Sequence, residues 1–100
     1  MHLNRLQESL KKWLSDRGVN EQTIDKWVQL SILMEEVGET SSTITKGVGD
    51  TSEEIADVII SAICLAISLN IDIDEAVRRK LIILQSRKPT YVDNHIRITH

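Results

Sequence analysis

Acidic side chains form two clusters in the middle of this 100-residue sequence. The first cluster comes from the run LMEEVGE and the second from EEIAD; the five carboxylates are those of Glu35, Glu36, Glu39, Glu54 and Asp57. Residues three or four apart lie on the same side of an α-helix, so each cluster would project from one side of its own helix. Two such sides facing each other would hold hard cations such as Mg²⁺, which suits metal-dependent phosphate chemistry.

Four stretches of the sequence are predicted to be helical. In the first, Leu3, Leu6 and Leu10 begin a series of apolar residues spaced three and four apart, which is typical of an amphipathic helix. Gly47 ends the second stretch, and Pro89 cannot continue the fourth. The predicted helices cover residues 2–17, 21–46, 52–69 and 73–87, and an extended C-terminal arm covers residues 90–100.

The composition favours an all-α domain whose helices pack through aliphatic side chains. Hydrophobic residues make up 41% of the chain, but only 3% of it is aromatic, with no Phe and a single Pro. This length predicts one domain over residues 1–100. Because so short a chain buries only a limited core by itself, we expect it to associate with a copy of itself.

The second predicted helix has an apolar face and a carboxylate face. At about 100° per residue, Leu30, Leu33, Val37 and Ile44 fall within one stripe, and the first acidic cluster projects from the other side. Three clustered carboxylates repel one another unless cations or bases neutralise them. The helix therefore buries one face and offers carboxylates from another.

The third predicted helix is apolar on nearly every side, which is typical of a central, buried helix. We expect a partner subunit to supply part of that burial, around Ile59 and Ile63. The second acidic cluster stands at the head of this helix, where buried carboxylates need a compensating charge. Cys64 lies among apolar residues in mid-helix, and we interpret it as a core residue rather than a nucleophile.

Charge is divided unevenly along the chain, although the net charge is only −3. Residues 35–57 contain seven acidic residues and one basic residue, whereas residues 78–100 contain six basic residues and one acidic residue. This separation favours binding of cations at one place and of anions at another. The acidic middle argues against nucleic-acid binding. With no apolar span of about 20 residues and a single cysteine, we expect no membrane segment and a reducing cytoplasmic location.

The paired motif resembles the signature of the MazG-like family of all-α nucleoside triphosphate pyrophosphohydrolases. That signature is EExxE, a variable spacer and then ExxD; here EEVGE at 35–39 and EIAD at 54–57 are separated by fourteen residues. The likeness extends over residues 24–88, through the neighbouring hydrophobic pattern, the KG turn and the EAVRRKL run. It is closest to the short, single-domain members of the family.

The resemblance implies a helical bundle built by tight dimerisation, often assembled into a dimer of dimers. It also implies Mg²⁺-dependent hydrolysis of a nucleoside or deoxynucleoside triphosphate at the α-phosphorus, with Mn²⁺ as a possible substitute and removal of surplus or non-standard nucleotides as the role. All five carboxylates are then catalytic candidates. The family's metal ligands map onto Glu36, Glu39, Glu54 and Asp57, and Glu35 has a supporting role or holds an additional ion.

Family members usually follow a lysine of the fourth helix with asparagine and arginine positions before a tyrosine. Lys80, Arg87 and Tyr91 match part of this pattern, but the usual asparagine is not in place and Pro89 interrupts the run. The resemblance makes Lys80 and Arg87 candidates for contact with the β- or γ-phosphate, within one subunit or across a subunit boundary. A solvated helix face is the alternative interpretation.

Two tryptophans are candidates for stacking on the nucleobase, since an aromatic face offers sequence-tolerant affinity. Trp27 shares the helical angle of Leu30 and Val37, so core packing is the favoured interpretation, and we favour it for Trp13 as well. Ile32 lies on the carboxylate side of the second helix, where it could form one wall of a base pocket.

Three other functions are alternatives to this one. A dimeric dUTPase-like hydrolase of the same broader superfamily would act on dUTP and on dUDP. A non-catalytic helical dimer would bind a nucleotide, or another protein, without turnover. A metal-storage or di-iron bundle is disfavoured, because His2, His95 and His100 lie at the ends of the chain. The KGVGD connection lacks the Gly-Lys-Ser/Thr ending of a phosphate-binding loop.

Overall fold

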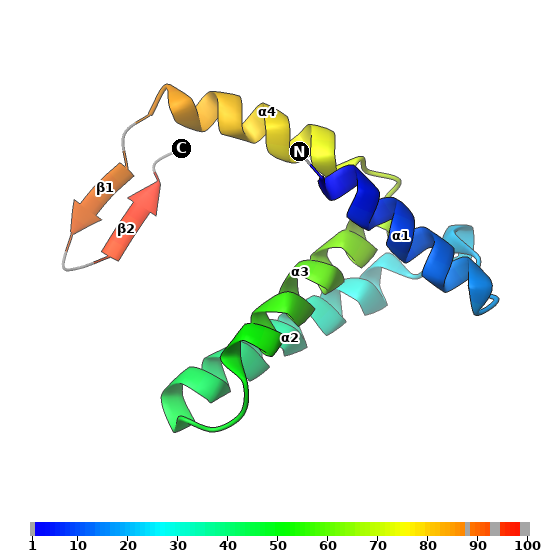
Figure 1. Ribbon diagram of the computed structural model, residues 1–100, viewed down its shortest axis with the longest axis horizontal. Helices are drawn as coiled ribbons and strands as arrows, with labels where there is room; N and C mark the ends of the chain where they lie inside the picture. Colours follow the sequence, from blue (N-terminus) through cyan, green and yellow to red (C-terminus); the bar gives the residue numbers. More distant parts are fainter. Residues whose placement is uncertain (1, 88, 93–94, 99–100) are drawn as a thin grey trace.

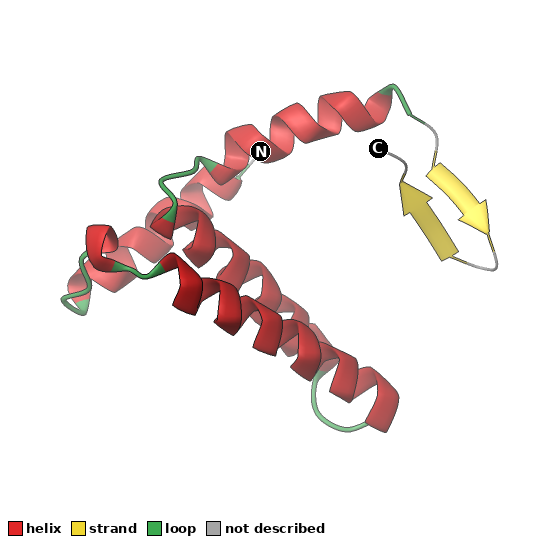
Figure 2. Ribbon diagram, turned by 180° about the vertical axis from the view of Figure 1, so that it is seen from behind, coloured by secondary structure: helices red, strands yellow, loops and turns green. Residues whose placement is uncertain are grey.

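The computed structural model describes residues 2–87, 89–92 and 95–98. The chain is all-α apart from a short C-terminal hairpin, as the composition predicts (Figures 1 and 2). The elements are α1 (Leu3–Asp16), a 3₁₀ turn η1 (Glu21–Thr23), α2 (Lys26–Lys46), α3 (Thr51–Ser68), α4 (Ile73–Gln85), β1 (Pro89–Val92) and β2 (His95–Ile98).

Helices α2 and α3 lie side by side and run in opposite directions, joined by a four-residue connection (Figure 1). Gly47 ends α2 in the left-handed conformation, with φ of 66°, and its N–H donates to the carbonyl of Thr43. Asp50 then caps α3 by accepting from the backbone N–H groups of Ser52 and Glu53. The hydroxyl of Ser52 also donates to Asp50 and holds the pKa of that carboxyl below its ordinary value. These caps place the start of α3 beside the end of α2.

The second helix begins later than predicted. Asn20 caps the 3₁₀ turn η1, and α2 starts only at Lys26, after Asp25. The carboxylate of Asp25 accepts from the N–H of Trp27 at 2.8 Å, which is the usual arrangement of an N-cap. A second capping residue within this stretch therefore divides what the sequence predicts as one helix.

Helix α4 leaves α3 at a sharp break and lies apart from the α2–α3 pair (Figure 1). Asn70 has a φ of 56°, which ends α3, and Asp72 caps α4. Among the described residues no single helix is long and apolar enough to cross a membrane. Helices α3 and α4 reach that length and apolar content only when they are taken together, and the pair is bent by 110° at this break.

The apolar core of the single chain is small. Its buried apolar residues in the described part of the chain are Ile63, Ala66 and Ile67. The predicted apolar stripe of α2 is exposed instead, with Ile44 67% accessible, and Ile59 of α3 is exposed too. The radius of gyration is 15.8 Å, against about 13 Å for a compact domain of this length. The burial predicted for α2 and α3 is therefore incomplete without further packing.

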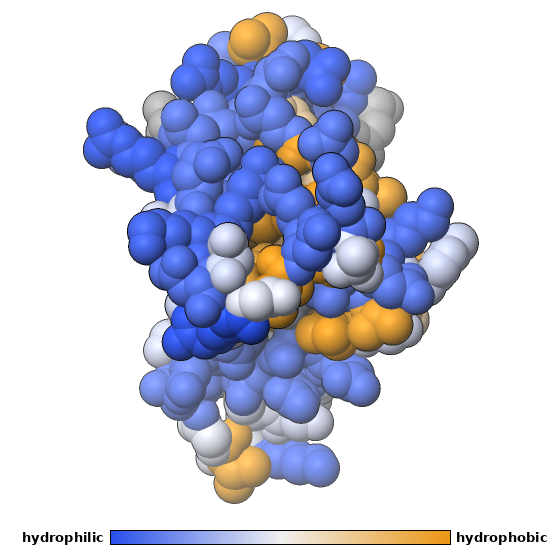
Figure 3. Space-filling model, turned by 90° about the vertical axis from the view of Figure 1, so that its right-hand side faces the viewer, coloured by the Kyte–Doolittle hydropathy of each residue, from blue (hydrophilic) through white to orange (hydrophobic). Residues whose placement is uncertain are grey.

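The surface on the α1 side of the molecule differs from these apolar faces. It is mainly hydrophilic, with hydrophobic residues visible in separate patches (Figure 3). The exposed large hydrophobic residues of the described chain lie mostly on α2, α3 and α4.

The predicted extended arm is an antiparallel hairpin. Its register pairs Pro89 with Ile98 and Val92 with His95. The fourth helix ends at Gln85, two residues before the predicted end, and the N–H groups of Ser86 and Arg87 donate to the carbonyls of Ile83 and Leu84 in a tighter final turn. Of the predicted arm, residues 93–94 and 99–100 lie outside the described residues, as does Lys88.

Candidate active site

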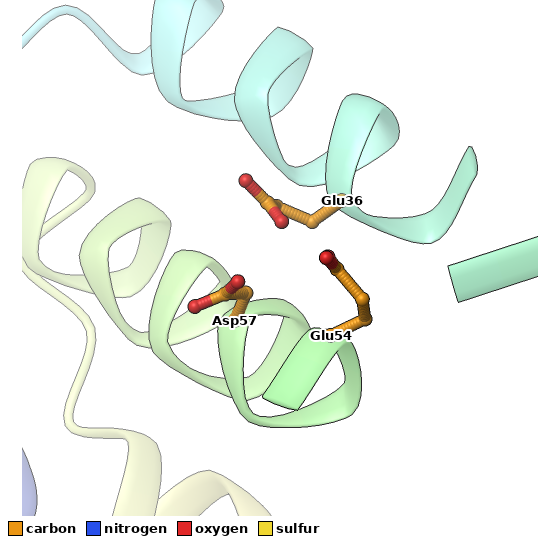
Figure 4. Close-up of side chains that lie close together, drawn as sticks. All are labelled: Glu36, Glu54 and Asp57. Atoms are coloured by element: carbon orange, nitrogen blue, oxygen red, sulfur yellow. The ribbon is translucent and has the colours of Figure 1, made fainter. Parts of the chain in front are cut away.

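Three carboxylates from the two acidic clusters converge between α2 and α3. Glu36 projects from α2, and Glu54 and Asp57 project from α3 toward the same space (Figure 4). Each offers one oxygen, and the three oxygens lie within 4.8 Å of one another. All three residues are half-buried. The pairing of α2 with α3 therefore brings the two clusters together, as the sequence predicts.

Two oxygens in this group lack a partner. Oε2 of Glu36 and Oε2 of Glu54 are shielded from solvent and accept no hydrogen bond from any described residue. A buried carboxylate oxygen without a donor costs free energy unless a proton or a cation compensates it. An oxygen-only group of this kind suits a hard divalent cation such as Mg²⁺ or Mn²⁺. The residues present therefore fit a divalent metal ion.

The same crowding changes the acidity of two side chains. Burial, followed by the charges of Glu39 and Asp57, raises the pKa of Glu36 above its ordinary value of 4.5. Burial and then a hydrogen bond with Glu39 raise the pKa of Glu54. Both shifts favour the neutral carboxyl in the metal-free protein. A cation would oppose them, because it stabilises the charged form.

The other two predicted carboxylates lie beside this group. Glu39 is exposed, and its charge helps to raise the pKa of both Glu36 and Glu54. Glu35 is exposed, and its charge helps to raise the pKa of Glu36. Both side chains therefore act electrostatically on the group of convergent carboxylates.

The predicted nucleotide contacts do not lie with the carboxylates in the single chain. Trp13 is 51% exposed on α1, where the guanidinium of Arg17 lies 4.1 Å from the ring centroid. Trp27 is 68% exposed at the start of α2, so in the single chain it does not pack into a core. Lys80 is exposed on α4, and Arg87 is half-buried just beyond that helix. Since α4 lies apart from α2, it does not bring Lys80 to the carboxylates of its own chain.

The position of Cys64 supports its interpretation as a packing residue. The thiol is half-buried in α3, and burial raises its pKa. A raised pKa lowers the fraction of nucleophilic thiolate.

Two buried polar residues were missed by the sequence analysis. Asp74 is 4% exposed and forms an ion pair with Arg78 at 2.8 Å, and Gln7 is 5% exposed at the break between α3 and α4. A signal for Gln7 exists in the sequence, because it lies on the helical stripe of Leu3, Leu10 and Leu14. A polar residue on an apolar stripe indicates a buried hydrogen-bonding role.

Comparison with known families gives this carboxylate group a context. The model of the MazG nucleotide pyrophosphohydrolase domain matches residues 25–92, which include α2, α3, α4 and both acidic clusters. The chain belongs to the MazG family. It is a nucleotide pyrophosphohydrolase by that membership. No curated protein matches the chain.

A solved structure agrees with this membership over nearly the whole MazG chain. It is the cyanophage S-2L MazG-like pyrophosphohydrolase bound to dGDP and three catalytic Mn²⁺ ions per active site. The two chains are 29% identical, the match covers 96% of this chain and 95% of that one, and the TM-score is 0.65. The resemblance inferred from EEVGE and EIAD is confirmed.

Proposed function

We propose that this MazG protein hydrolyses a nucleoside or deoxynucleoside triphosphate at the α-phosphorus, releasing a monophosphate and pyrophosphate. The observation that supports this most is the group of convergent carboxylates with two shielded, unpartnered oxygens. The expected role is removal of surplus or non-standard nucleotides from the pool. With Cys64 as its single cysteine, the reducing cytoplasm is the proposed compartment.

Glu36, Glu39, Glu54 and Asp57 are the proposed ligands of Mg²⁺, with Mn²⁺ as a substitute. The bound metal would neutralise phosphate charge, polarise the α-phosphorus and lower the pKa of an attacking water. The side chains hold these positions from two helices, so the angle between α2 and α3 sets the geometry. Glu35, exposed beside Glu36, holds an additional ion or adjusts the charge of the group. The Mn²⁺ ions of the cyanophage enzyme support a divalent-metal site.

The proposed assembly is a homodimer or a dimer of dimers. Its support is the exposed apolar surface of α2 and α3, which includes Leu30, Val37 and Ile59. Contiguous apolar surface of this kind marks protein–protein contact. Two α2–α3 pairs packed together would form a four-helix bundle and complete the burial predicted from the sequence.

Lys80 and Arg87 are the proposed contacts for the β- or γ-phosphate. Because α4 lies apart from the α2–α3 pair, the proposal assigns them to the nucleotide held by a second copy. The basic end of one chain would then face the acidic middle of another, which is favourable electrostatically. The exposed rings of Trp13 and Trp27 are candidates for stacking on the base.

The test is hydrolysis of a panel of triphosphates with Mg²⁺ in water labelled with ¹⁸O. Attack at the α-phosphorus gives a monophosphate that carries the label and an unlabelled pyrophosphate. Label in the pyrophosphate would mean attack at the β-phosphorus. Formation of a diphosphate and orthophosphate would overturn the proposed reaction.

A dUTPase-like preference is the second candidate. The cyanophage structure holds a diphosphate, dGDP, which makes diphosphates a natural part of the substrate panel. Turnover of dUTP and dUDP in preference to the other nucleotides would favour this candidate. Binding of nucleotide and Mg²⁺ in calorimetry, with no turnover of any substrate, would favour a non-catalytic module.

A further inference from the structure

Gln7 is a buried polar residue where α1 crosses the break between α3 and α4. Among the described residues of α1, Gln7 is the one that is buried. Its Nε2 donates to the carbonyl of Ile71 at 2.8 Å, and its Oε1 accepts from the N–H of Ile73 at 3.0 Å. Both ends of the side-chain amide are thus used on the backbone that connects α3 to α4.

The rest of this connection is held by local hydrogen bonds. The N–H of Ile71 donates to the carbonyl of Ala66 at 2.9 Å, which ends α3. The carboxylate of Asp72 accepts from the N–H of Glu75 at 3.1 Å and caps α4. The N–H of Ile73 belongs to the first turn of α4, where the helix itself offers no acceptor. Gln7 supplies that acceptor from another element.

In the described part of the chain, helix α4 packs mainly against α1, without contact of similar extent to α2 or α3 (Figure 1). The break bends the α3–α4 pair by 110°. Gln7 is therefore the buried polar link between α1 and the point from which α4 projects.

Length makes α4 sensitive to this link. At about 1.5 Å per residue, Lys80 lies roughly 10 Å and Arg87 roughly 20 Å along the chain direction from Ile73. A rotation of about 10° at the break would move Arg87 by roughly 3 Å, which is enough to break a hydrogen bond.

We propose that Gln7 is a positioning residue for nucleotide binding, because it fixes the direction of α4 and so the places that Lys80 and Arg87 reach. The inference rests on the proposed function, since it uses the phosphate contacts assigned there. It predicts that a residue of α1, outside the family's paired motif, controls affinity for the nucleotide without changing affinity for the metal.

The experiment replaces Gln7 with Met, which has a similar length but neither amide group. Three quantities are measured: hydrogen exchange at the N–H of Ile73, affinity for Mn²⁺ without nucleotide, and KM for the best triphosphate. Exchange should become faster and KM should rise about tenfold or more, because small displacements of binding groups have large effects. The Mn²⁺ affinity should stay within about twofold, because α2 and α3 are untouched.

A destabilised control separates positioning from general loss of stability. Ile63→Val removes one methylene from the buried core and should lower Tm without changing KM. An unchanged KM in Gln7→Met, an equal rise of KM in Ile63→Val, or a parallel loss of Mn²⁺ affinity would each overturn the proposal. If Gln7→Met does not fold, Gln7→Glu replaces it: this variant keeps the acceptor for Ile73 but loses the donor to the carbonyl of Ile71, so exchange at Ile73 should stay unchanged while KM rises and Mn²⁺ affinity stays within about twofold. An unchanged KM in this variant would overturn the proposal.

The proposed function can fail separately. If the wild-type protein hydrolyses no triphosphate, the reaction proposed above is wrong. The dissociation constant of a non-hydrolysable triphosphate then replaces KM. A larger dissociation constant in Gln7→Met, with unchanged Mn²⁺ affinity, would still support the positioning role. An unchanged dissociation constant would still overturn the positioning role.

Discussion

At the scale of residues, the carboxylates between α2 and α3 carry the chemistry. Their charges repel one another, and two of their oxygens are shielded without a hydrogen-bond donor. Such an arrangement destabilises the metal-free fold and is retained where a cation compensates it. The loss of stability in the metal-free protein is thus linked to the binding of a metal ion.

Asp57→Asn should lower kcat/KM by about a hundredfold or more, since it removes a charged oxygen from the group at little cost in volume. The matched control is Glu53→Gln, because Glu53 is an exposed carboxylate on the same helix and outside the group. Both variants should keep the helical circular dichroism of the wild type. Loss of helicity in Asp57→Asn alone would mean that Asp57 is structural.

The raised pKa of Glu36 and Glu54 predicts how the metal-free protein responds to pH. The folded state binds protons more readily than the unfolded state between the ordinary value of 4.5 and the raised pKa. The free energy of unfolding should therefore increase as pH falls from neutral through that window. Thermal melts in the presence of a chelator measure this change in stability with pH. Glu36→Gln should reduce the dependence of Tm on pH. A decrease of Tm over the same window, equal in both proteins, would contradict the assignment.

At the scale of elements, the connection between α2 and α3 decides whether the two acidic clusters meet. Gly47 and Gly49 both have positive φ. A Cβ at Gly47 would have open space, whereas one at Gly49 would lie 3.2 Å from Cγ2 of Thr43. The second glycine thus combines a conformational and a steric requirement.

Gly49→Ala should therefore destabilise the protein more than Gly47→Ala. The left-handed conformation alone costs an alanine about 1–2 kcal/mol at either position, and Gly49 adds the close approach to Thr43. Urea unfolding measures the difference. Because the connection sets how α2 and α3 align, Gly49→Ala should also weaken Mn²⁺ binding. Equal unfolding free energies for the two variants would mean that the Thr43 side chain moves aside at little energetic cost.

At the scale of the whole molecule, the single chain leaves much apolar surface exposed. This surface lies along α2 and α3, and the basic residues Arg78, Arg79 and Lys80 of α4 lie apart from that acidic pair of helices. Both features have one explanation in the proposed assembly of identical copies, which would cover the apolar surface and bring opposite charges together.

Ile59→Asp should convert the proposed dimer into a monomer or an aggregate, because a buried, unpaired charge is costly at an interface. Light scattering measures the mass. Val19→Asp is the control, since Val19 is also an exposed apolar residue but lies in the connection after α1. An unchanged oligomer in Ile59→Asp would remove α3 from the proposed interface.

Mixed subunits test whether two chains share one site. Asp57→Asn and Lys80→Gln should each be inactive or nearly so by themselves. After unfolding and refolding together, they should recover about a quarter of the wild-type activity, since half of the dimers are mixed and each has one intact site of two. Recovery no greater than the sum of the separate variants would place Lys80 and the carboxylates in the same chain, or remove Lys80 from the site.

Much of the fold could be read from the sequence, because it depends on local signals. Helical periodicity, the glycine after Lys46 and the proline at position 89 predict the helices to within a few residues. The predicted start of α2 is wrong because Asp25 caps the helix, and the pairing of β1 with β2 goes beyond the extended arm that the sequence predicts. Strand pairing depends on the partner strand as well as on local preference.

The family and the two acidic clusters follow from the sequence alone, because the spacing of EEVGE and EIAD on helices is a local property of the chain. The folded chain was needed to show which carboxylates converge, which oxygens are shielded from solvent, and that Gln7 holds the break before α4. Those facts depend on contacts between residues far apart in the chain. Such contacts arise from how helices pack: a local pattern can indicate that a polar residue such as Gln7 is buried, but it does not specify which groups that residue meets.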